Sequence, residues 1–229
     1  METSNQNIKT QVYNLVILDK SGSMESIRKE AVDGYNETLA TIRLAQQKHM
    51  DTQEHYVTLA AFCGCGITKI YDKTPINAAD KLQLSQYEPC CCTPLFDAIG
   101  ISVKQLKHDI QSAEDAAVLV TIITDGFENA SREWTSAAVK ALIDECKKDG
   151  WMFSFIGASE DILKVASKLA IDNTLLWNKS HAGTEAMFDT VESAQERYYD
   201  KMAAPCCVGA SVAERKKMRK AFAENYFED

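Results

Sequence analysis

The strongest constraint on the fold is an apolar run near the start of the chain, Val12 to Leu18, which leads directly into Asp19-Lys20-Ser21-Gly22-Ser23. A run that is apolar at successive positions is typical of a strand buried on both faces, as in a parallel sheet. Ligands of open α/β sheets bind at the carboxyl ends of the strands. We therefore expect a polar site directly after this strand.

Two further segments offer oxygen-bearing side chains at the same edge. A second apolar run, Ala116 to Thr124, ends in Asp125-Gly126, and Cys92-Thr93-Pro94 precedes a segment with helical spacing of apolar residues. One carboxylate and two hydroxyls at positions i, i+2 and i+4 can direct three oxygens at a hard cation such as Mg²⁺. That set is short of ligands and of charge, and Thr93 and Asp125 would complete it.

The combined set resembles the metal-ion-dependent adhesion site of the von Willebrand factor A (vWA) domain family. The family motif has D-x-S-x-S on a first loop, a Thr on a second and an Asp on a third. The chain offers these in the same order, as Asp19, Ser21, Ser23, Thr93 and Asp125. The resemblance implies that the two serines and the threonine bind the metal directly, and that the two aspartates bind it directly or through water. It covers residues 11–202 and is of the intracellular bacterial, single-domain type.

Each segment also has a purely structural explanation. Ser21 and Ser23 can cap a following helix, Thr93 is a good N-cap before Pro94, and Asp125-Gly126 is an ordinary turn. Each of these explanations covers one segment, whereas a metal site covers all three. Because three of the five ligands are neutral hydroxyls, we expect Mg²⁺ or Mn²⁺ to bind in preference to Ca²⁺.

The rest of the chain alternates predicted helices and strands. In order these are a helix over 26–48, strands over 55–62 and 67–71, a helix over 95–110, a strand over 116–124, a helix over 134–146, a strand over 151–156, a helix over 162–169, a strand over 174–177 and a helix over 187–198. Glycines between the second and third strands indicate a hairpin, so one edge strand should run antiparallel. The pattern predicts a doubly wound, mostly parallel α/β sheet of the vWA or Rossmann-like type, with helices on both faces.

Residues 203–229 lie beyond the vWA-like domain predicted at 11–202. Residues 203–210 contain Pro and Gly and are expected to form a linker, and Ser211 to Glu214 is a capping box for a final helix. The basic residues of that helix are Arg215, Lys216, Lys217, Arg219 and Lys220. Two roles stay open for it, a solvated helix folded back on the acidic body or a docking helix for an acidic partner.

Five of the eight cysteines fall at the predicted metal edge: Cys63 and Cys65 in the hairpin, and Cys90, Cys91 and Cys92 directly before Thr93. They can be incidental small residues, or they can form a Zn²⁺ site, an iron–sulfur centre or a redox gate. The C-x-C and C-C-C spacings differ from the C-x₂₋₄-C pairs of ordinary zinc sites, and the histidines form no matching pair. The sequence therefore favours incidental use.

Composition narrows the class of protein. A chain of 229 residues that is 45% hydrophobic has the size of one α/β domain with a tail. Its net charge of -8 argues against general binding to nucleic acid or anionic membranes. The polar amino terminus lacks a signal-peptide core and no apolar stretch reaches the roughly 18 residues of a membrane span, so we expect a cytoplasmic protein.

The favoured function is a non-enzymatic, divalent-cation-dependent protein-binding module. A metal held mainly by hydroxyls stays electrophilic and can take a Glu or Asp carboxylate from a partner protein. A Mg²⁺-dependent hydrolase or phosphoryl-transfer enzyme is an alternative, but the chain lacks a G-x-x-x-x-G-K-[ST] loop, and the three site loops contain no histidine to act as a base. A third possibility, an assembly subunit that works with an ATPase or a modifying enzyme, differs mainly in the partner.

Overall fold

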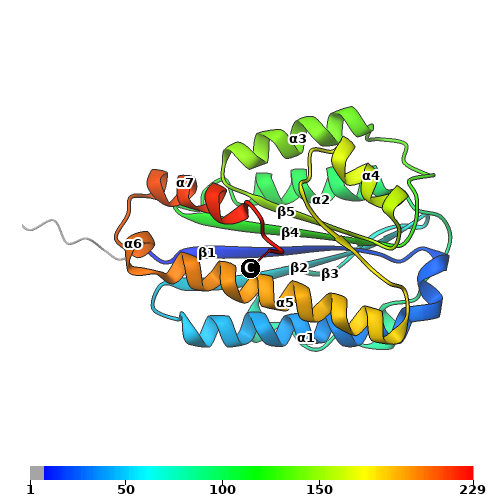
Figure 1. Cartoon of the computed structure of the whole chain (residues 1–229), viewed down its shortest axis with the longest axis horizontal. Helices are drawn as coiled ribbons and strands as arrows, with labels where there is room; N and C mark the ends of the chain where they lie inside the picture. The colour runs from blue at the N-terminus through cyan, green and yellow to red at the C-terminus, as the bar shows by residue number, and fades with distance from the viewer. Residues whose placement is uncertain (1–7, 229) are drawn as a thin grey trace, which may run out of the picture.

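A six-stranded sheet forms the centre of the computed structural model, which describes residues 8–228 (Figure 1). The strands are β1 (Thr10–Asp19), β2 (Gln53–Cys63), β3 (Gly66–Pro75), β4 (Ala116–Thr124), β5 (Met152–Gly157) and β6 (Asn173–Leu176). Their order across the sheet is β3-β2-β1-β4-β5-β6, and β3 pairs antiparallel with β2 while the other pairs are parallel. The predicted fold class, with one antiparallel edge strand, is confirmed.

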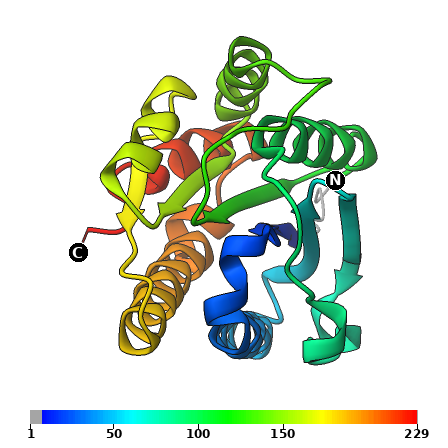
Figure 2. The ribbon, with the colours of Figure 1, turned by 90° about the vertical axis from the view of Figure 1, so that its right-hand side faces the viewer.

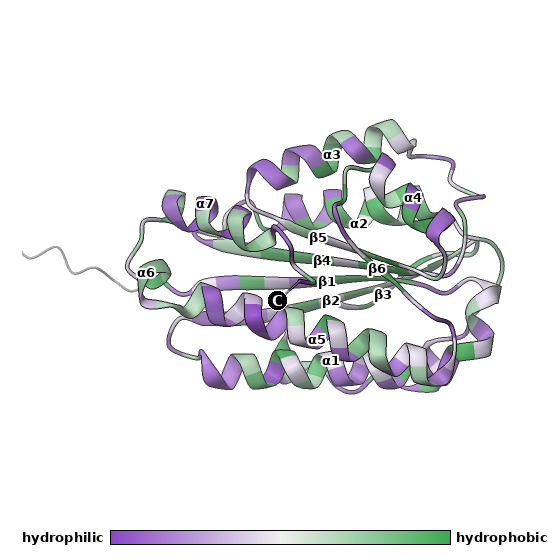
Figure 3. Ribbon diagram, in the orientation of Figure 1, coloured by the Kyte–Doolittle hydropathy of each residue, from purple (hydrophilic) through white to green (hydrophobic). Residues whose placement is uncertain are grey.

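Helices cover both faces of this sheet. On one face lie α1 (Arg28–Lys48) and α5 (His181–Ala203), and on the other lie α2 (Leu95–Asp109), α3 (Ser136–Lys148) and α4 (Glu160–Lys168) (Figure 1). The sheet strands are mostly hydrophobic, whereas the helices show many hydrophilic residues (Figure 3). This layering is the doubly wound arrangement, in which each helix buries one apolar stripe on the sheet.

The central strand β1 explains why its sequence is apolar at successive positions. Leu15 and Ile17 belong to the core under α2 and α3, whereas Val16 and Leu18 belong to the core under α1 and α5. Successive side chains of a strand point to opposite faces, so a central strand needs apolar residues on both. The same strand therefore delivers Asp19 to the middle of the sheet edge.

Glycine allows α1 and α5 to approach each other closely. A Cβ atom built on Gly34 of α1 would lie 1.9 Å from the ring of Phe188 in α5. The Cβ position is the same for every side-chain rotamer, so any residue with a Cβ atom would collide with Phe188. This contact therefore requires glycine at position 34. The contact fixes the spacing of the two helices under β1.

Two helix starts differ from the prediction. The predicted helix covers residues 26–48, but the structure forms a 3₁₀ helix, η1 (Gly22–Ile27), and α1 begins only at Arg28. The helix α3 begins at Ser136, where the Thr135 hydroxyl accepts a hydrogen bond from Ala138 N. Trp134, predicted to lie on the helix, therefore belongs to the preceding loop and packs against Gly100 of α2.

The start of α2 also corrects one structural explanation. The N-cap position is occupied by Pro94 and not by Thr93, and the first turn is capped from the loop after β4, where Phe96 N donates to Glu128 Oε2 and Asp97 N donates to Ser131 Oγ. Pro94 adopts φ -79° and ψ 66°, outside the helical region, so the helix starts one residue later than a Thr-Pro signal suggests. The Thr93 side chain is therefore not used as a helix cap.

The C-terminal segment adds α6 (Pro205–Val208) and α7 (Val212–Ala223) at the end of the sheet where β1 and β4 begin. The sequence predicts a linker over 203–210, but Pro205 is well suited to a first helical turn and Cys207 is buried. The capping box of Ser211 and Glu214 is present as predicted. Two short 3₁₀ helices, η2 (Ile76–Ala78) and η3 (Leu84–Gln86), lie in the connection from β3 to α2. Within residues 8–228, no helix is both long enough and apolar enough to cross a membrane.

Candidate metal centre

The predicted site residues meet at the carboxyl-terminal edge of the parallel strands, which faces the viewer in Figure 2. Asp19 is the last residue of β1, and Thr124 is the last residue of the neighbouring β4. Leu18 pairs with Ile123 across the two strands, so Asp19 and Asp125 leave the sheet side by side. The third loop, which carries Thr93, runs into α2 beside them.

Asp19 is a fully buried carboxylate that the surrounding backbone and hydroxyls orient. Its Oδ1 accepts a hydrogen bond from Ser21 N at 2.7 Å, and its Oδ2 accepts one from Thr124 Oγ1 at 2.6 Å. Tyr87 donates its hydroxyl to the Asp19 carbonyl oxygen. Burial raises the pKa of the Asp19 carboxyl to about 6, although the hydrogen bonds from Thr124 and Ser21 act in the opposite direction. A carboxylate buried in this way gains from a cation placed against it.

A chain of hydrogen bonds joins the first and third loops. Ser21 Oγ lies 3.2 Å from Ser23 Oγ, and Ser23 Oγ donates to Asp125 Oδ1 at 2.6 Å. Ser21 occupies the N-cap position of η1, but its side chain makes no capping hydrogen bond. The serine hydroxyls therefore serve the contact with Asp125 and not the start of a helix.

Thr93 is held in the same cluster from the second loop. Thr93 N donates to Asn129 Oδ1 at 2.9 Å, and Asn129 N donates to Thr93 O at 3.1 Å. A Cβ atom built on Gly126 would lie 2.8 Å from Thr93 Oγ1 and 3.4 Å from Asp19 Oδ2. Gly126 therefore leaves open the space into which the threonine hydroxyl and the Asp19 carboxylate both project.

The donor set suits a hard divalent cation. Two carboxylates and three hydroxyls, all oxygen donors, come together from three loops, and Mg²⁺ and Mn²⁺ favour oxygen ligands. The residues brought together are those that the sequence singles out, and we call them the oxygen cluster: Asp19, Ser21, Ser23, Thr93 and Asp125. Their role as metal ligands stays a prediction.

Lys179 brings a positive charge of the protein itself to this cluster. It lies between β6 and α5, and its Nζ contacts both Asp125 Oδ2 and the Ser23 carbonyl oxygen. The Asp125 side chain is 2% exposed and that of Lys179 is 27% exposed. An ammonium group thus occupies the outer side of Asp125, where a bound cation would compete with it.

Four residues that shape the site are not predicted from the sequence: Thr124, Asn129, Tyr87 and Lys179. Thr124 carries a usable signal, because a hydroxyl at the end of an otherwise apolar strand needs a partner. The other three contact the site through tertiary packing, and nothing in their spacing marks them.

The cysteines predicted at this edge are also brought together beside the oxygen cluster. The sulfur atoms of Cys63, Cys65 and Cys90 all lie within 4.8 Å of one another. The hydrogen bond with Cys63 and partial burial raise the pKa of the Cys90 thiol to about 12, so in this state the group is protonated.

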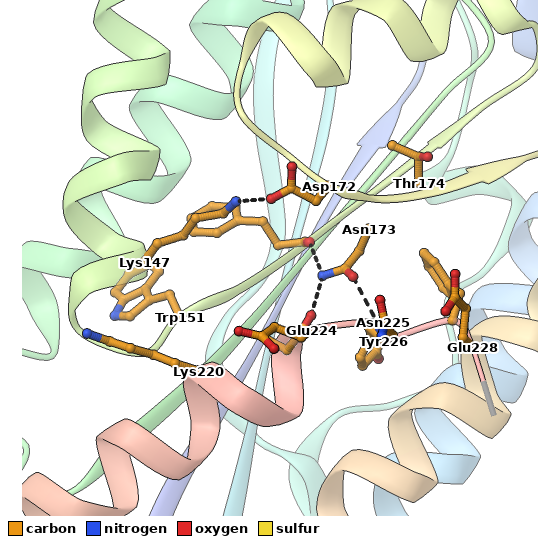
Figure 4. Close-up of a pocket in the computed structure, with 13 residues that line it drawn as sticks. Lys147, Trp151, Asp172, Asn173, Thr174, Lys220, Glu224, Asn225, Tyr226 and Glu228 are labelled. Atoms are coloured by element: carbon orange, nitrogen blue, oxygen red, sulfur yellow. Dashed lines mark hydrogen bonds and ion pairs between the residues drawn. The ribbon is translucent and has the colours of Figure 1, made fainter.

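A hollow of about 500 Å³ lies away from this edge, between β5, β6 and the C-terminal segment (Figure 4). Asn173 donates to the carbonyl oxygens of Phe153 and Ala223 and accepts from Tyr226 N, which ties the segment to the edge strand. Lys147 Nζ donates a hydrogen bond to Asp172 Oδ2 at 2.9 Å. Asn173 thus fastens the C-terminal segment to the edge strand.

Solved structures with a similar fold include bacterial surface proteins. The pilus adhesin SpaC from Lactobacillus rhamnosus GG aligns with a TM-score of 0.60 at 15% identity, over 85% of this chain and 31% of that chain. The PilB minor pilin from Streptococcus sanguinis aligns with a TM-score of 0.54 at 11% identity, over 84% of this chain and 63% of that chain. This chain therefore spans less than two thirds of the length of either protein.

The manganese-loaded Plasmodium vivax TRAP protein aligns with a TM-score of 0.51 at 19% identity, over 80% of this chain and 74% of that chain. Identities this low establish a shared α/β fold and nothing finer. No protein-family model and no curated protein sequence matches the chain.

Proposed function

We propose that this protein is a non-enzymatic protein-binding module that uses a divalent cation, Mg²⁺ or Mn²⁺, at a vWA-type adhesion site. The observation that carries the proposal is the hydrogen-bond chain from Asp19 through Ser21 and Ser23 to Asp125, with the Thr93 hydroxyl directed at the same space. Helix capping or turn formation within one loop does not explain why side chains of three loops meet at the same place.

In the proposal, Ser21, Ser23 and Thr93 hold the ion directly, and Asp19 and Asp125 hold it directly or through water. The ion supplies a coordination position that takes a Glu or Asp carboxylate of a partner protein. Thr124 and Tyr87 keep Asp19 oriented, and Asn129 keeps Thr93 oriented. Similar folds in a pilus adhesin and in a manganese-loaded protein support this class of function.

The proposal assigns no catalytic group. The Ser23 hydroxyl is engaged with the Asp125 carboxylate and the Ser21 hydroxyl contacts Ser23, and the three loops contain no histidine that could serve as a general base. A nucleophile at Asp19 would therefore lack a histidine base in these loops, which favours the binding module over the enzyme alternative.

The test compares cation-dependent capture by the intact protein and by a site variant. Immobilised wild type, Thr93→Ala and the control Thr190→Ala are each incubated with a lysate of the source organism, in Mg²⁺ or in EDTA. We expect a set of proteins retained in Mg²⁺ by wild type and by Thr190→Ala, and lost in EDTA or with Thr93→Ala. Thr190 is a matched control because it is a half-buried threonine of α5, outside the site, whose hydroxyl donates to Ala186 O.

An identical set of proteins under all conditions would contradict the proposal. Circular dichroism of the variants keeps a loss of binding distinct from a loss of fold. Turnover of a phosphate ester or peptide that disappears with Asp19→Ala would favour the enzyme alternative.

A further inference from the structure

Four thiols from two distant segments converge next to the oxygen cluster. Cys63 ends β2 and Cys65 lies in the turn to β3, whereas Cys90 and Cys91 precede Thr93. The Cys63 and Cys90 sulfurs are 3.2 Å apart, those of Cys65 and Cys91 are 3.2 Å apart, and those of Cys65 and Cys90 are 3.8 Å apart. The pairs therefore share members and form one group of four sulfurs, the thiol cluster.

The backbone around the thiol cluster is arranged to bring the two segments together. Cys91 adopts φ 59°, the left-handed region that a non-glycine residue rarely occupies. Cys90 N donates to Lys20 O at 2.8 Å, and Gly22 N donates to Cys91 O at 3.1 Å. These bonds fasten the cysteine loop to the loop that carries Ser21 and Ser23.

The hairpin approaches the cysteine loop through a glycine. A Cβ atom on Gly64 would lie 2.4 Å from Cys92 Sγ and 3.2 Å from Cys91 Cβ. Glycine between Cys63 and Cys65 therefore lets the two segments pack closely without moving the Cys92 side chain. The left-handed conformation of Cys91 and this close approach favour a specific role for the cysteines over incidental use of small residues.

Zinc–sulfur bonds of about 2.3 Å place the thiolates of a tetrahedron roughly 3.8 Å apart. The Cys65 and Cys90 sulfurs are 3.8 Å apart, and the sulfurs of Cys63, Cys65 and Cys90 all lie within 4.8 Å of one another. Cys91 reaches this group through Cys65, so zinc binding would separate the two pairs that are 3.2 Å apart and draw the fourth sulfur in. Thiolate ligands select Zn²⁺ over the hard cations that an oxygen cluster prefers. The thiol cluster and the oxygen cluster therefore differ in the metal they take.

We propose that Cys63, Cys65, Cys90 and Cys91 bind one Zn²⁺ ion through four thiolates. Each thiol releases its proton to solvent when the ion binds, so the loaded site carries four thiolates and one Zn²⁺, a net charge of two minus. The ion joins the β2–β3 hairpin to the loop that ends in Thr93, and so holds that loop against the Lys20 to Gly22 backbone. This structural role is independent of the function proposed for the oxygen cluster.

The test is a metal analysis of the whole chain, purified under reducing conditions without chelator and dialysed against Zn²⁺. We expect one equivalent of zinc in wild type. Cys65→Ser and Cys91→Ser should each weaken zinc binding by more than the roughly 10- to 100-fold that loss of an outer-shell partner produces. Competition with a chromophoric chelator measures the affinity.

Three matched controls separate the zinc site from its neighbours. Cys92→Ser changes a thiol of the same loop that is not in the cluster, and Cys206→Ser changes an exposed thiol of α6. Both should retain one zinc, as should Asp19→Ala, because the oxygen cluster is not involved. Retention of zinc by Asp19→Ala keeps this proposal distinguishable from the proposed function.

Thiol labelling gives a second reading that does not depend on a variant folding. In the zinc-loaded protein Cys65, Cys90 and Cys91, which are at least partly exposed, should resist labelling, and a chelator should release them, whereas the buried Cys146 and Cys207 should resist labelling in both states. Less than about 0.1 equivalent of zinc after reconstitution would overturn the proposal. So would peptide mapping that finds Cys63–Cys90 or Cys65–Cys91 disulfides and no bound metal in protein purified with reductant.

Discussion

At the level of single residues, metal binding at the oxygen cluster depends on whether the Asp125 carboxylate pairs with Lys179 or with a metal ion. Its side chain is almost fully buried and is bound by both Ser23 and Lys179. A divalent ion brought to the same carboxylate would be repelled by the lysine ammonium, since like charges a few ångströms apart oppose each other even in water. Lys179 therefore acts as an internal competitor of the metal.

Replacing Lys179 with methionine keeps the length of the side chain and removes its charge. We expect Lys179→Met to bind Mn²⁺ about tenfold more tightly, because tenfold corresponds to about 1.4 kcal/mol and removal of one nearby charge supplies an energy of that order. Isothermal calorimetry measures the affinity. Lys164→Met is the control, because Lys164 pairs with Asp161 on the exposed side of α4. Equal affinity in wild type and Lys179→Met would show that the lysine does not compete.

The convergence of Asp19, Ser23, Thr93 and Asp125 is predictable from sequence, because each follows a strand or precedes a helix whose place in the sheet the pattern dictates. Lys179 is not predictable in this way. It reaches Asp125 from a connection between β6 and α5, and the path of that connection is set by packing. The two cysteine segments converge for the same kind of reason, through the backbone conformation of Cys91 and the close approach at Gly64.

At the scale of elements, the basic helix α7 is fastened by a buried ion cluster. Arg219 Nη2 lies 2.5 Å from Asp115 Oδ1, and Arg215 Nη1 lies 3.0 Å from Asp115 Oδ2. Burial by itself raises the pKa of the Asp115 carboxyl, but the Arg219 charge and the hydrogen bonds from Thr10 and both arginines outweigh it and hold the pKa below its usual value. Arg215 and Arg219 thus fold back on the acidic body through buried ion pairs, and Lys216 lies 3.9 Å from Asp149 at the surface. The sequence alone does not reveal which of the five basic residues are buried.

Breaking this cluster should destabilise the protein more than removing a neighbouring surface charge. We expect Arg219→Met to lower the free energy of unfolding by about 3 kcal/mol, because it leaves a buried carboxylate with one arginine. Lys220→Met, at an exposed position of the same helix, should change it by less than about 0.5 kcal/mol. Urea unfolding of the two variants provides the comparison. Equal effects would mean that the ion cluster does not hold α7.

At the scale of the whole molecule, the sheet order and the helical layers follow from the alternation of apolar runs and amphipathic segments. The sequence predicts the parallel core and the antiparallel edge strand because hydrophobic period and turn residues are local signals. Exact helix starts, such as those of α2 and α3, depend on backbone angles at Pro94 and Thr135 that the periodicity does not encode. The docking of α7 depends on ion pairs between residues about 100 positions apart.

His55 should make the stability of the whole molecule fall in acid. Burial lowers the pKa of His55 to about 3, and its ring packs edge-on against Tyr199 between β2 and α5. The unfolded chain, in which the pKa is near 6.5, binds more protons than the native state between the two values. Unfolding free energy is therefore lost as the pH falls from about 6.5 toward 3, by at most about 1.4 kcal/mol per pH unit from this group.

The measurement is urea unfolding between pH 7 and pH 4.5 for wild type, His55→Gln and the exposed control His108→Gln. The unfolding free energy is plotted against pH for each protein. The difference in slope between wild type and His55→Gln then separates the effect of this histidine from that of the carboxylates that titrate in the same range. We expect a shallower acid loss in His55→Gln and an unchanged slope in His108→Gln. Parallel curves for wild type and His55→Gln would mean that His55 accepts a proton in the folded state.

Mn²⁺ anomalous diffraction shows whether a divalent cation binds at the oxygen cluster. Crystals of the zinc-loaded protein are soaked in Mn²⁺, and data are collected at wavelengths that separate the two metals. We expect a manganese peak bounded by Asp19, Ser21, Ser23, Thr93 and Asp125, which is absent in a Thr93→Ala crystal. Manganese found only at the thiol cluster, or no manganese peak at the carboxyl-terminal edge of the sheet, would contradict it.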